Sequence, residues 1–214
     1  MPAFHGMRRA LVALAFTVPL AAVGADRGAT VASSGNGDGA PPCASCHGAD
    51  GGGNAAAGYP RLAGLPAEYL AAQLHAFADG RRVNAVMKPT ASALSDADIA
   101  AVAEHYAQMA PPAGDGGTPG DHPQGRRIAQ DGLWEQGVPA CTTCHGPDGR
   151  GVGSVFPPLA GQHANYLRNQ IEAWQSGDRH DDPHGLMASV AGRLEADQAA
   201  AVAEYFAALP ATRQ

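Results

Sequence analysis

Cys43-Ala-Ser-Cys46-His47-Gly48 recurs in this 214-residue chain as Cys141-Thr-Thr-Cys144-His145-Gly146, 98 residues further on. The two copies of C-x-x-C-H-G contain all four cysteines of the chain, so none is left over. Paired cysteines in an exported protein usually indicate disulfides. A histidine directly after each pair indicates a different use of the thiols.

Two thiols three residues apart can reach two vinyl groups on one edge of a porphyrin, and the following histidine can then reach one face of the iron. C-x-x-C-H is typical of c-type haem attachment. We therefore predict two covalently bound haem c groups, one held by Cys43 and Cys46 and the other by Cys141 and Cys144. A structural zinc site needs four Cys or His ligands, whereas the two motifs offer six. A thioredoxin-like pair would lie in a βαβ pattern, which neither motif has around it.

The sequence around the motifs is also repeated. Tyr59–Gly64 (YPRLAG) recurs 97 residues later as Phe156–Gly161 (FPPLAG), and Leu94–Ala107 recurs 100 residues later as Leu194–Ala207. Internal repeats of this kind indicate homologous structural units. We predict domains at residues 26–110 and 124–214, joined by a Gly/Pro-rich linker at residues 111–123.

Within each unit the apolar residues follow a helical period. Leu70, Leu74 and Phe77 are spaced as on one helix face, and the second copy keeps the same steps. Ser95 with Asp98 resembles a capping box at the start of a further helix. Strand-like alternation is absent, so the predicted fold class is all-α, with each unit wrapped around one haem.

The second axial ligand of each iron is inferred by elimination. Beyond residue 25 the chain has three methionines, Met87, Met109 and Met187. Met87 and Met187 each precede the last repeated helix by seven residues, whereas Leu209 replaces Met109 in the second copy. We predict that His47 with Met87, and His145 with Met187, are the metal ligands. The two ligand methionines are expected to lie in loops before the last helix of each unit, and Met109 is expected to fill the core.

The histidines also need partners for their second ring nitrogen. A metal-bound histidine usually donates that N–H to an acceptor nearby. The carbonyls of Pro60 and Pro157 are the predicted acceptors, and Tyr59 and Phe156 are expected to line the haem slots.

The N-terminus has the layout of a secretory signal peptide. Arg8 and Arg9 precede an apolar run at residues 10–23, and Ala25 closes a stretch of small residues. We predict a signal peptide at residues 1–25 and a periplasmic location. Without Arg8 and Arg9 the 14 basic residues fall to 12 against 20 acidic ones, a formal charge of −8. This charge argues against nucleic-acid binding and suits docking to a basic patch on a protein partner. Beyond the signal, no apolar run predicts a transmembrane segment.

Taken together, the two motifs, the Y/F-P-x-L-A-G segments, the Y-L-x-x-Q helices and the paired methionines resemble the di-haem class I cytochromes c of the cytochrome c4 type. The resemblance implies two tandem cytochrome c lobes packed as a pseudo-two-fold pair. It also implies a periplasmic carrier that moves electrons from respiratory donors to a terminal acceptor such as a haem-copper oxidase. Because a methionine on each iron would leave no open position for a substrate, we expect the chain not to be an enzyme. Such lobes usually open with an amphipathic helix; residues 124–132 could begin one, whereas residues 26–42 are rich in Gly, Ala and Ser.

Two other functions remain open. One is an electron-accepting subunit of a periplasmic dehydrogenase, as in flavocytochromes. The other is a di-haem peroxidase, which is disfavoured because a methionine on each iron would leave no open position.

Overall fold

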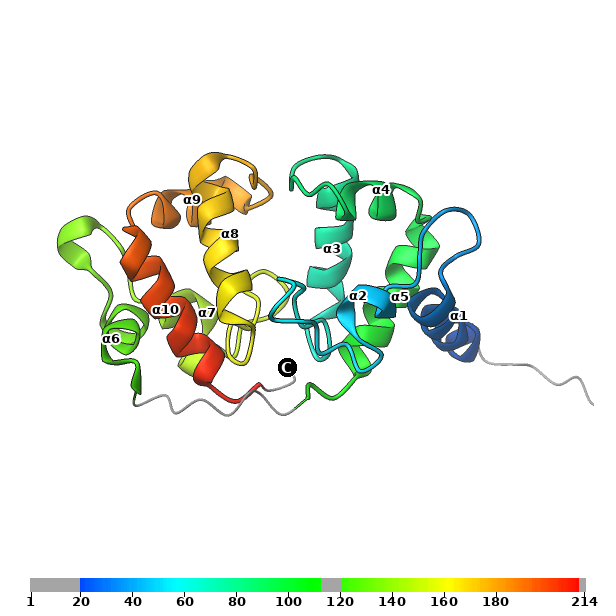
Figure 1. Ribbon diagram of the computed structural model, residues 1–214, viewed down its shortest axis with the longest axis horizontal. Coiled ribbons are helices and arrows are strands. Elements are labelled where there is room, and N and C mark those ends of the chain that lie inside the picture. Colours follow the sequence, from blue (N-terminus) through cyan, green and yellow to red (C-terminus); the bar gives the residue numbers. More distant parts are fainter. Residues whose placement is uncertain (1–19, 113–120, 212–214) are drawn as a thin grey trace, which may run out of the picture.

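Two helical lobes lie side by side in the computed structural model (Figure 1). The structure describes residues 20–112 and 121–211, and at residues 20–26 and 183 it describes the backbone only. The regular structure of these residues consists of helices and a few isolated bridges, so the predicted all-α class is confirmed. Residues 1–19 of the predicted signal peptide and 113–120 of the predicted linker lie outside the described residues. The domain boundaries therefore stay predictions.

The helices of the two lobes follow the same order, as the sequence repeat requires. In the described part of the first lobe they are α1 (Leu20–Ser34), α2 (Ala44–His47), α3 (Ala67–Ala78), α4 (Met87–Ser92) and α5 (Asp96–Gln108). Their counterparts in the second lobe are α6 (Pro123–Asp131), α7 (Thr142–His145), α8 (Ala164–Ser176), α9 (Leu186–Ala191) and α10 (Ala196–Ala208). Short 3-10 turns lie at η2 (Trp134–Gln136), η3 (Pro147–Gly149) and η4 (Pro183–Gly185). Figure 1 shows α3 and α8 on either side of the centre, with α4 and α9 at the same end of the molecule.

The first helix of each lobe crosses the last one at a glycine. A Cβ atom on Gly28 of α1 would collide with the carbonyl of Ala101 in α5. A Cβ atom on Gly125 of α6 would collide in the same way with the carbonyl of Ala201 in α10. The first part of the Gly-rich segment at residues 26–42 thus belongs to α1. Its residue Gly28 has no Cβ, so the backbones of α1 and α5 can approach closely.

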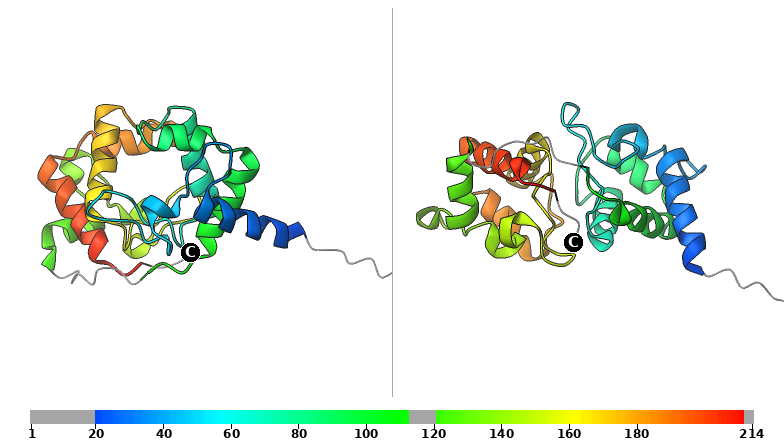
Figure 2. Two further views of the ribbon diagram at one scale, coloured as in Figure 1. Left: turned by 45° about the vertical axis from the view of Figure 1, so that its right-hand side comes forward. Right: turned by 90° about the horizontal axis from the view of Figure 1, so that it is seen from below.

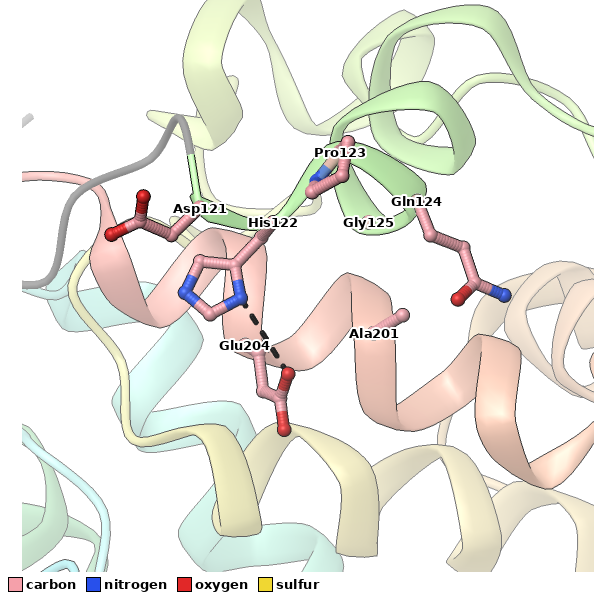
Figure 3. Close-up of a pocket in the computed structure, with 7 residues that line it drawn as sticks. All are labelled: Asp121, His122, Pro123, Gln124, Gly125, Ala201 and Glu204. Atoms are coloured by element: carbon pink, nitrogen blue, oxygen red, sulfur yellow. Dashed lines mark ion pairs between the residues drawn. The ribbon is translucent and has the colours of Figure 1, made fainter.

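The second of these crossings is drawn in Figure 3, where Gly125 faces Ala201. A shallow hollow opens beside it, at the start of α6, and His122 Nδ1 lies 3.5 Å from a carboxylate oxygen of Glu204. None of the predicted haem-binding residues lines this hollow.

The last helix of the first lobe begins with the predicted capping box. The Ser95 side chain accepts from the Asp98 N–H, and the Asp98 carboxylate accepts in return from the Ser95 N–H. Asp98 is buried and also accepts from Arg27 Nε at 2.6 Å. Burial alone would raise the pKa of Asp98, but the hydrogen bonds from Ser95 and Arg27 hold it below its usual value. The start of α5 is thereby tied to α1.

Each lobe has its own hydrophobic core. The first core joins α1, α3 and α5, and its buried residues are Val31, Ala32, Leu65, Leu70, Val102, Ala103 and Tyr106. The second joins α6, α8 and α10 and includes Ile128, Leu167, Ile171, Val202 and Phe206. A half-buried cysteine of the motif packs against each core, Cys43 on the first and Cys141 on the second.

Hydrogen bonds between loops join the two lobes, and we call this interface between the lobes the seam. Val83 N–H donates to the carbonyl of Asp178 at 2.7 Å, and His180 N–H donates to that of Arg81 at 2.9 Å. Buried Arg61 adds a side-chain link, since its Nη2 donates to the Ala160 carbonyl at 3.1 Å. Across residues 20–112 and 121–211, none of the helices is long and apolar enough to cross a membrane.

Candidate functional site

Each motif forms a single helical turn. Cys43 is the N-cap of α2, Cys46 follows three residues later, and Cys141 and Cys144 have the same places at α7. Residues three apart lie on one face of a helix, so both thiols of a motif can meet one edge of a flat group. The Cys43 thiol lies 3.9 Å from the carbonyl of Val31, and that of Cys141 lies 3.9 Å from the carbonyl of Ile128.

All four cysteines are free and half-buried. Burial raises the pKa of the Cys43 thiol and raises the pKa of Cys141 to about 11. The Cys43 and Cys141 thiols are therefore protonated at neutral pH in the protein without its cofactor.

The two motif histidines are buried and share one hydrogen-bonding arrangement. His47 Nδ1 lies 3.0 Å from the carbonyl of Pro60, and His145 Nδ1 lies 2.8 Å from that of Pro157. The predicted acceptors are thus confirmed. Burial lowers the pKa of both rings despite these hydrogen bonds, so each ring is neutral at pH 7. With Nδ1 as the donor, the lone pair of Nε2 is free to bind a metal.

Aromatic rings stand beside both histidines. The ring centroids of Tyr59 and His47 are 6.1 Å apart, and those of Phe156 and His145 are also 6.1 Å apart. Both aromatic side chains are half-buried. That Tyr59 and Phe156 line the haem slots stays a prediction.

The methionines lie on short helices, and the prediction that they lie in loops was wrong. Met87 is the first residue of α4 and Met187 the second residue of α9, and both side chains are half-buried. Pro89 does not prevent α4, because a proline is tolerated in the first helical turn. Met109 is the C-cap of α5 and packs against the first core, as predicted.

Two residues have buried polar atoms that the sequence analysis did not single out. Tyr106 Oη and Trp174 Nε1 are buried and have no hydrogen-bond partner among the described residues. Burial and the neighbouring Cys43 raise the pKa of Tyr106. The repeat could have identified both positions, since Phe206 and Phe77 are their counterparts and lack a polar atom.

These residues fit two covalently attached haems. Each lobe supplies a pair of thiols on one helical turn, a neutral buried histidine with Nε2 free, and a half-buried methionine. The buried polar atoms without partners show that the chain alone leaves donors unsatisfied in the interior. No three His, Cys, Asp or Glu side chains gather as a metal-ligand cluster in the described part of the chain. The fold and the donors define a two-lobed protein that carries one haem in each lobe.

Comparisons with known proteins give the same result. The family model for cytochrome c matches residues 25–110 and 124–210. The chain is 51% identical to the thiosulfate dehydrogenase electron acceptor of Thiomonas intermedia over 181 residues. The aligned region covers 80% of this chain and 82% of that protein. A solved thiosulfate dehydrogenase of Marichromatium purpuratum matches with a TM-score of 0.79 and 48% identity, over 86% of this chain but only 40% of that one. Reduced cytochrome c4 of Pseudomonas stutzeri matches with a TM-score of 0.75 and 31% identity, over 86% of this chain and 98% of that one.

The chain therefore belongs to the cytochrome c family. The predicted pair of tandem cytochrome c domains, the two covalent haem c groups and the c4-type resemblance are confirmed. Electron transfer is confirmed as its function.

Proposed function

We propose that this protein accepts electrons from a thiosulfate-oxidising dehydrogenase and passes them to a further redox protein. The observation that carries this proposal is the identity of 51% with an acceptor named for that dehydrogenase, against 31% with the solved cytochrome c4. The solved thiosulfate dehydrogenase extends well beyond the region that this chain matches. In our proposal a separate dehydrogenase supplies the thiosulfate chemistry, and this chain supplies the path for electrons.

We further propose that His47 with Met87, and His145 with Met187, would hold the two haem irons. An iron so ligated, when bound, takes up and gives back one electron in each lobe. The Pro60 and Pro157 carbonyls accept from Nδ1 of these rings, which would leave Nε2 free to bind the iron. Thioether ligation favours the reduced state and leaves no open coordination position. The chain by itself is then a carrier, not an enzyme.

The proposed location is the periplasm, reached through cleavage of the predicted signal peptide after Ala25. Helix α1 begins at Leu20, so this cleavage would shorten it to residues 26–34. The remaining part still includes Gly28 and Arg27, which contact α5. Intact mass of the protein from a periplasmic extract should correspond to a chain that starts at Asp26 and carries two haems.

The test is reduction of the oxidised protein by thiosulfate in the presence of the dehydrogenase from the same organism. Stopped-flow absorbance should show both haems reduced, two electrons per chain, at a rate that saturates with the concentration of this protein. A Cys43→Ser/Cys46→Ser variant should take up one electron, and so should its repeat match Cys141→Ser/Cys144→Ser. Thiosulfate alone should reduce neither haem. Rapid reduction without the dehydrogenase, or none with it, would contradict the proposal.

A second candidate is a diffusible carrier between respiratory donors and a haem-copper oxidase. The match to cytochrome c4 over 98% of that chain favours it. Co-purification distinguishes the two functions, because a dedicated acceptor should retain its dehydrogenase in stoichiometric amounts at physiological salt. Oxidation of the reduced protein by oxidase-containing membranes, with no dehydrogenase retained, would favour the diffusible carrier.

A further inference from the structure

The seam between the lobes contains a cluster of polar side chains around Arg82 and Arg179. The cluster draws equivalent residues from the two copies of the repeat. Both arginines of the cluster are buried, and each spans the two lobes. Arg82 donates from Nη1 to Gln73 at 2.8 Å and from Nη2 to Tyr166 at 2.6 Å. Arg179 donates from Nη1 to Gln170 at 3.1 Å and from Nη2 to Gln73 at 2.9 Å. Arg82 and Arg179, like Gln73 and Gln170, occupy equivalent positions in the two copies.

Two positions of this cluster differ between the copies. The Arg82 guanidinium lies over Phe77, with its carbon 4.5 Å from the ring centroid, whereas that of Arg179 lies 4.0 Å from the centroid of Trp174. Asp181 accepts from Arg179 Nε at 2.8 Å, but its counterpart in the first lobe is Asn84. The lobes are thus similar in backbone and unlike in the polar atoms at the seam.

The indole N–H of Trp174 is the unexplained atom. It is buried, and none of the described residues accepts its hydrogen bond. Buried donors are almost always paired, because an unpaired donor has lost its bonds to water without replacement. Trp174 packs against the second core, and so do Cys141, Leu159 and Val190 from the motif turn, the Phe156–Gly161 segment and α9. The indole thus shares its core with one thiol of the second motif.

The charge of the cluster indicates what kind of acceptor this is. Its buried members include two guanidinium groups and one carboxylate, a formal excess of one positive charge. An excess cation in a poorly solvated seam favours a neighbouring anion. The anionic groups of a haem are its propionates. We infer that Trp174 Nε1 donates to a propionate of the second haem, and that Phe77 gives the first haem no such donor.

The two haems are then unequal in a defined way. A hydrogen bond to a carboxylate draws negative charge away from the porphyrin, which favours the reduced iron and raises its potential. Only the second haem has this donor from the position shared by Phe77 and Trp174. The inference depends on haem attachment and not on which protein donates the electrons.

Redox titration of the intact di-haem protein tests it. Trp174→Phe gives the second lobe the residue of the first, and should lower one of the two midpoint potentials while the other stays unchanged. Haem methyl resonances of the ferric protein should assign the shifted wave to the second lobe. The matched control is Trp134→Phe, because Trp134 is the other tryptophan of the chain and is 70% exposed. This control should move neither midpoint.

A shape-preserving change covers the case in which Trp174→Phe packs poorly. Benzothienylalanine in place of tryptophan, in a Trp134→Phe background, removes the N–H at residue 174 and keeps the bicyclic ring. The same single midpoint should fall, with both thioether attachments retained by intact mass. Unchanged midpoints with this analogue would overturn the inference, and so would an equal shift of both.

Discussion

The crossing of the first and last helices gives a prediction whose sign follows from the structure. In an exposed helix, Gly→Ala stabilises by about 0.5–1 kcal/mol, because glycine loses more backbone entropy on folding. At Gly28 the added Cβ would collide with the Ala101 carbonyl and lie 2.9 Å from His105 Cβ. Backbone atoms and Cβ atoms cannot rotate away, so α1 must shift. Overpacking of this kind costs about 1–3 kcal/mol, and we expect Gly28→Ala to destabilise the first lobe by about 1–2 kcal/mol net.

Thermal unfolding of the haem-loaded protein measures this loss. If a lobe unfolds as its own unit, 1 kcal/mol lowers its Tm by about 4–8 °C. Gly125→Ala should cause a similar loss in the second lobe, where the new Cβ would lie 2.7 Å from Tyr205 Cβ. The control is Gly192→Ala, at a φ of −61° and with 3.2 Å to the nearest atom, which should change stability by less than about 0.5 kcal/mol. An unchanged or raised Tm for Gly28→Ala would refute the close-crossing argument.

Three further predictions follow from the ligands, the buried carboxylate and the net charge. Met87→Ala and Met187→Ala should each remove about half of the weak near-infrared band of ferric iron bound to methionine sulfur, whereas Met109→Leu should leave the band intact; loss of the band in Met109→Leu would contradict the assignment. Because the pKa of Asp98 is lowered in the folded state, its stabilising effect is present above the unfolded pKa of about 3.9 and is lost as the pH falls through the folded value. Asp98→Asn should therefore lower stability at pH 7, and its unfolding curves should depend less on pH below about 4 than those of the unaltered protein; identical acid dependence would count against the Arg27 pair. Rates of electron transfer to a basic partner should fall as ionic strength rises, because physiological salt screens the attraction between exposed charges more than about 8 Å apart. Rates that do not change with salt would favour an apolar contact.

Short-range patterns in the sequence were sufficient to predict much of the site. The C-x-x-C-H turns, the Pro60 and Pro157 carbonyls and the Ser95 capping box depend on residues close together in the chain. Their geometry follows from one helical turn or one loop, so spacing alone predicts it. The repeat then predicted two equivalent lobes without any knowledge of how they pack.

The first helix shows what local reasoning left open although a signal was present. Residues 26–42 are rich in Gly, Ala and Ser, yet Gly28, Val31 and Ala32 recur 97 residues later as Gly125, Ile128 and Ala129. In the folded lobe these residues meet the last helix, with Val31 and Ile128 fully or nearly fully buried. Tertiary packing stabilises a helix that its own residues would form poorly, because most helical stability in proteins comes from burial of one face.

The sequence by itself determined the cofactor, the number of lobes and their helical class, since a covalent motif and an apolar period are properties of neighbouring residues. Only the tertiary structure decided how the lobes face each other. The contacts of Arg82 with Tyr166, and of Arg179 with Gln73, join residues 84 and 106 positions apart. No spacing rule specifies such a contact, because it depends on the orientation of two packed bodies. The two arginines also stack on different rings, Arg82 on Phe77 and Arg179 on Trp174. The role of this difference at the interface follows only from the orientation of the lobes.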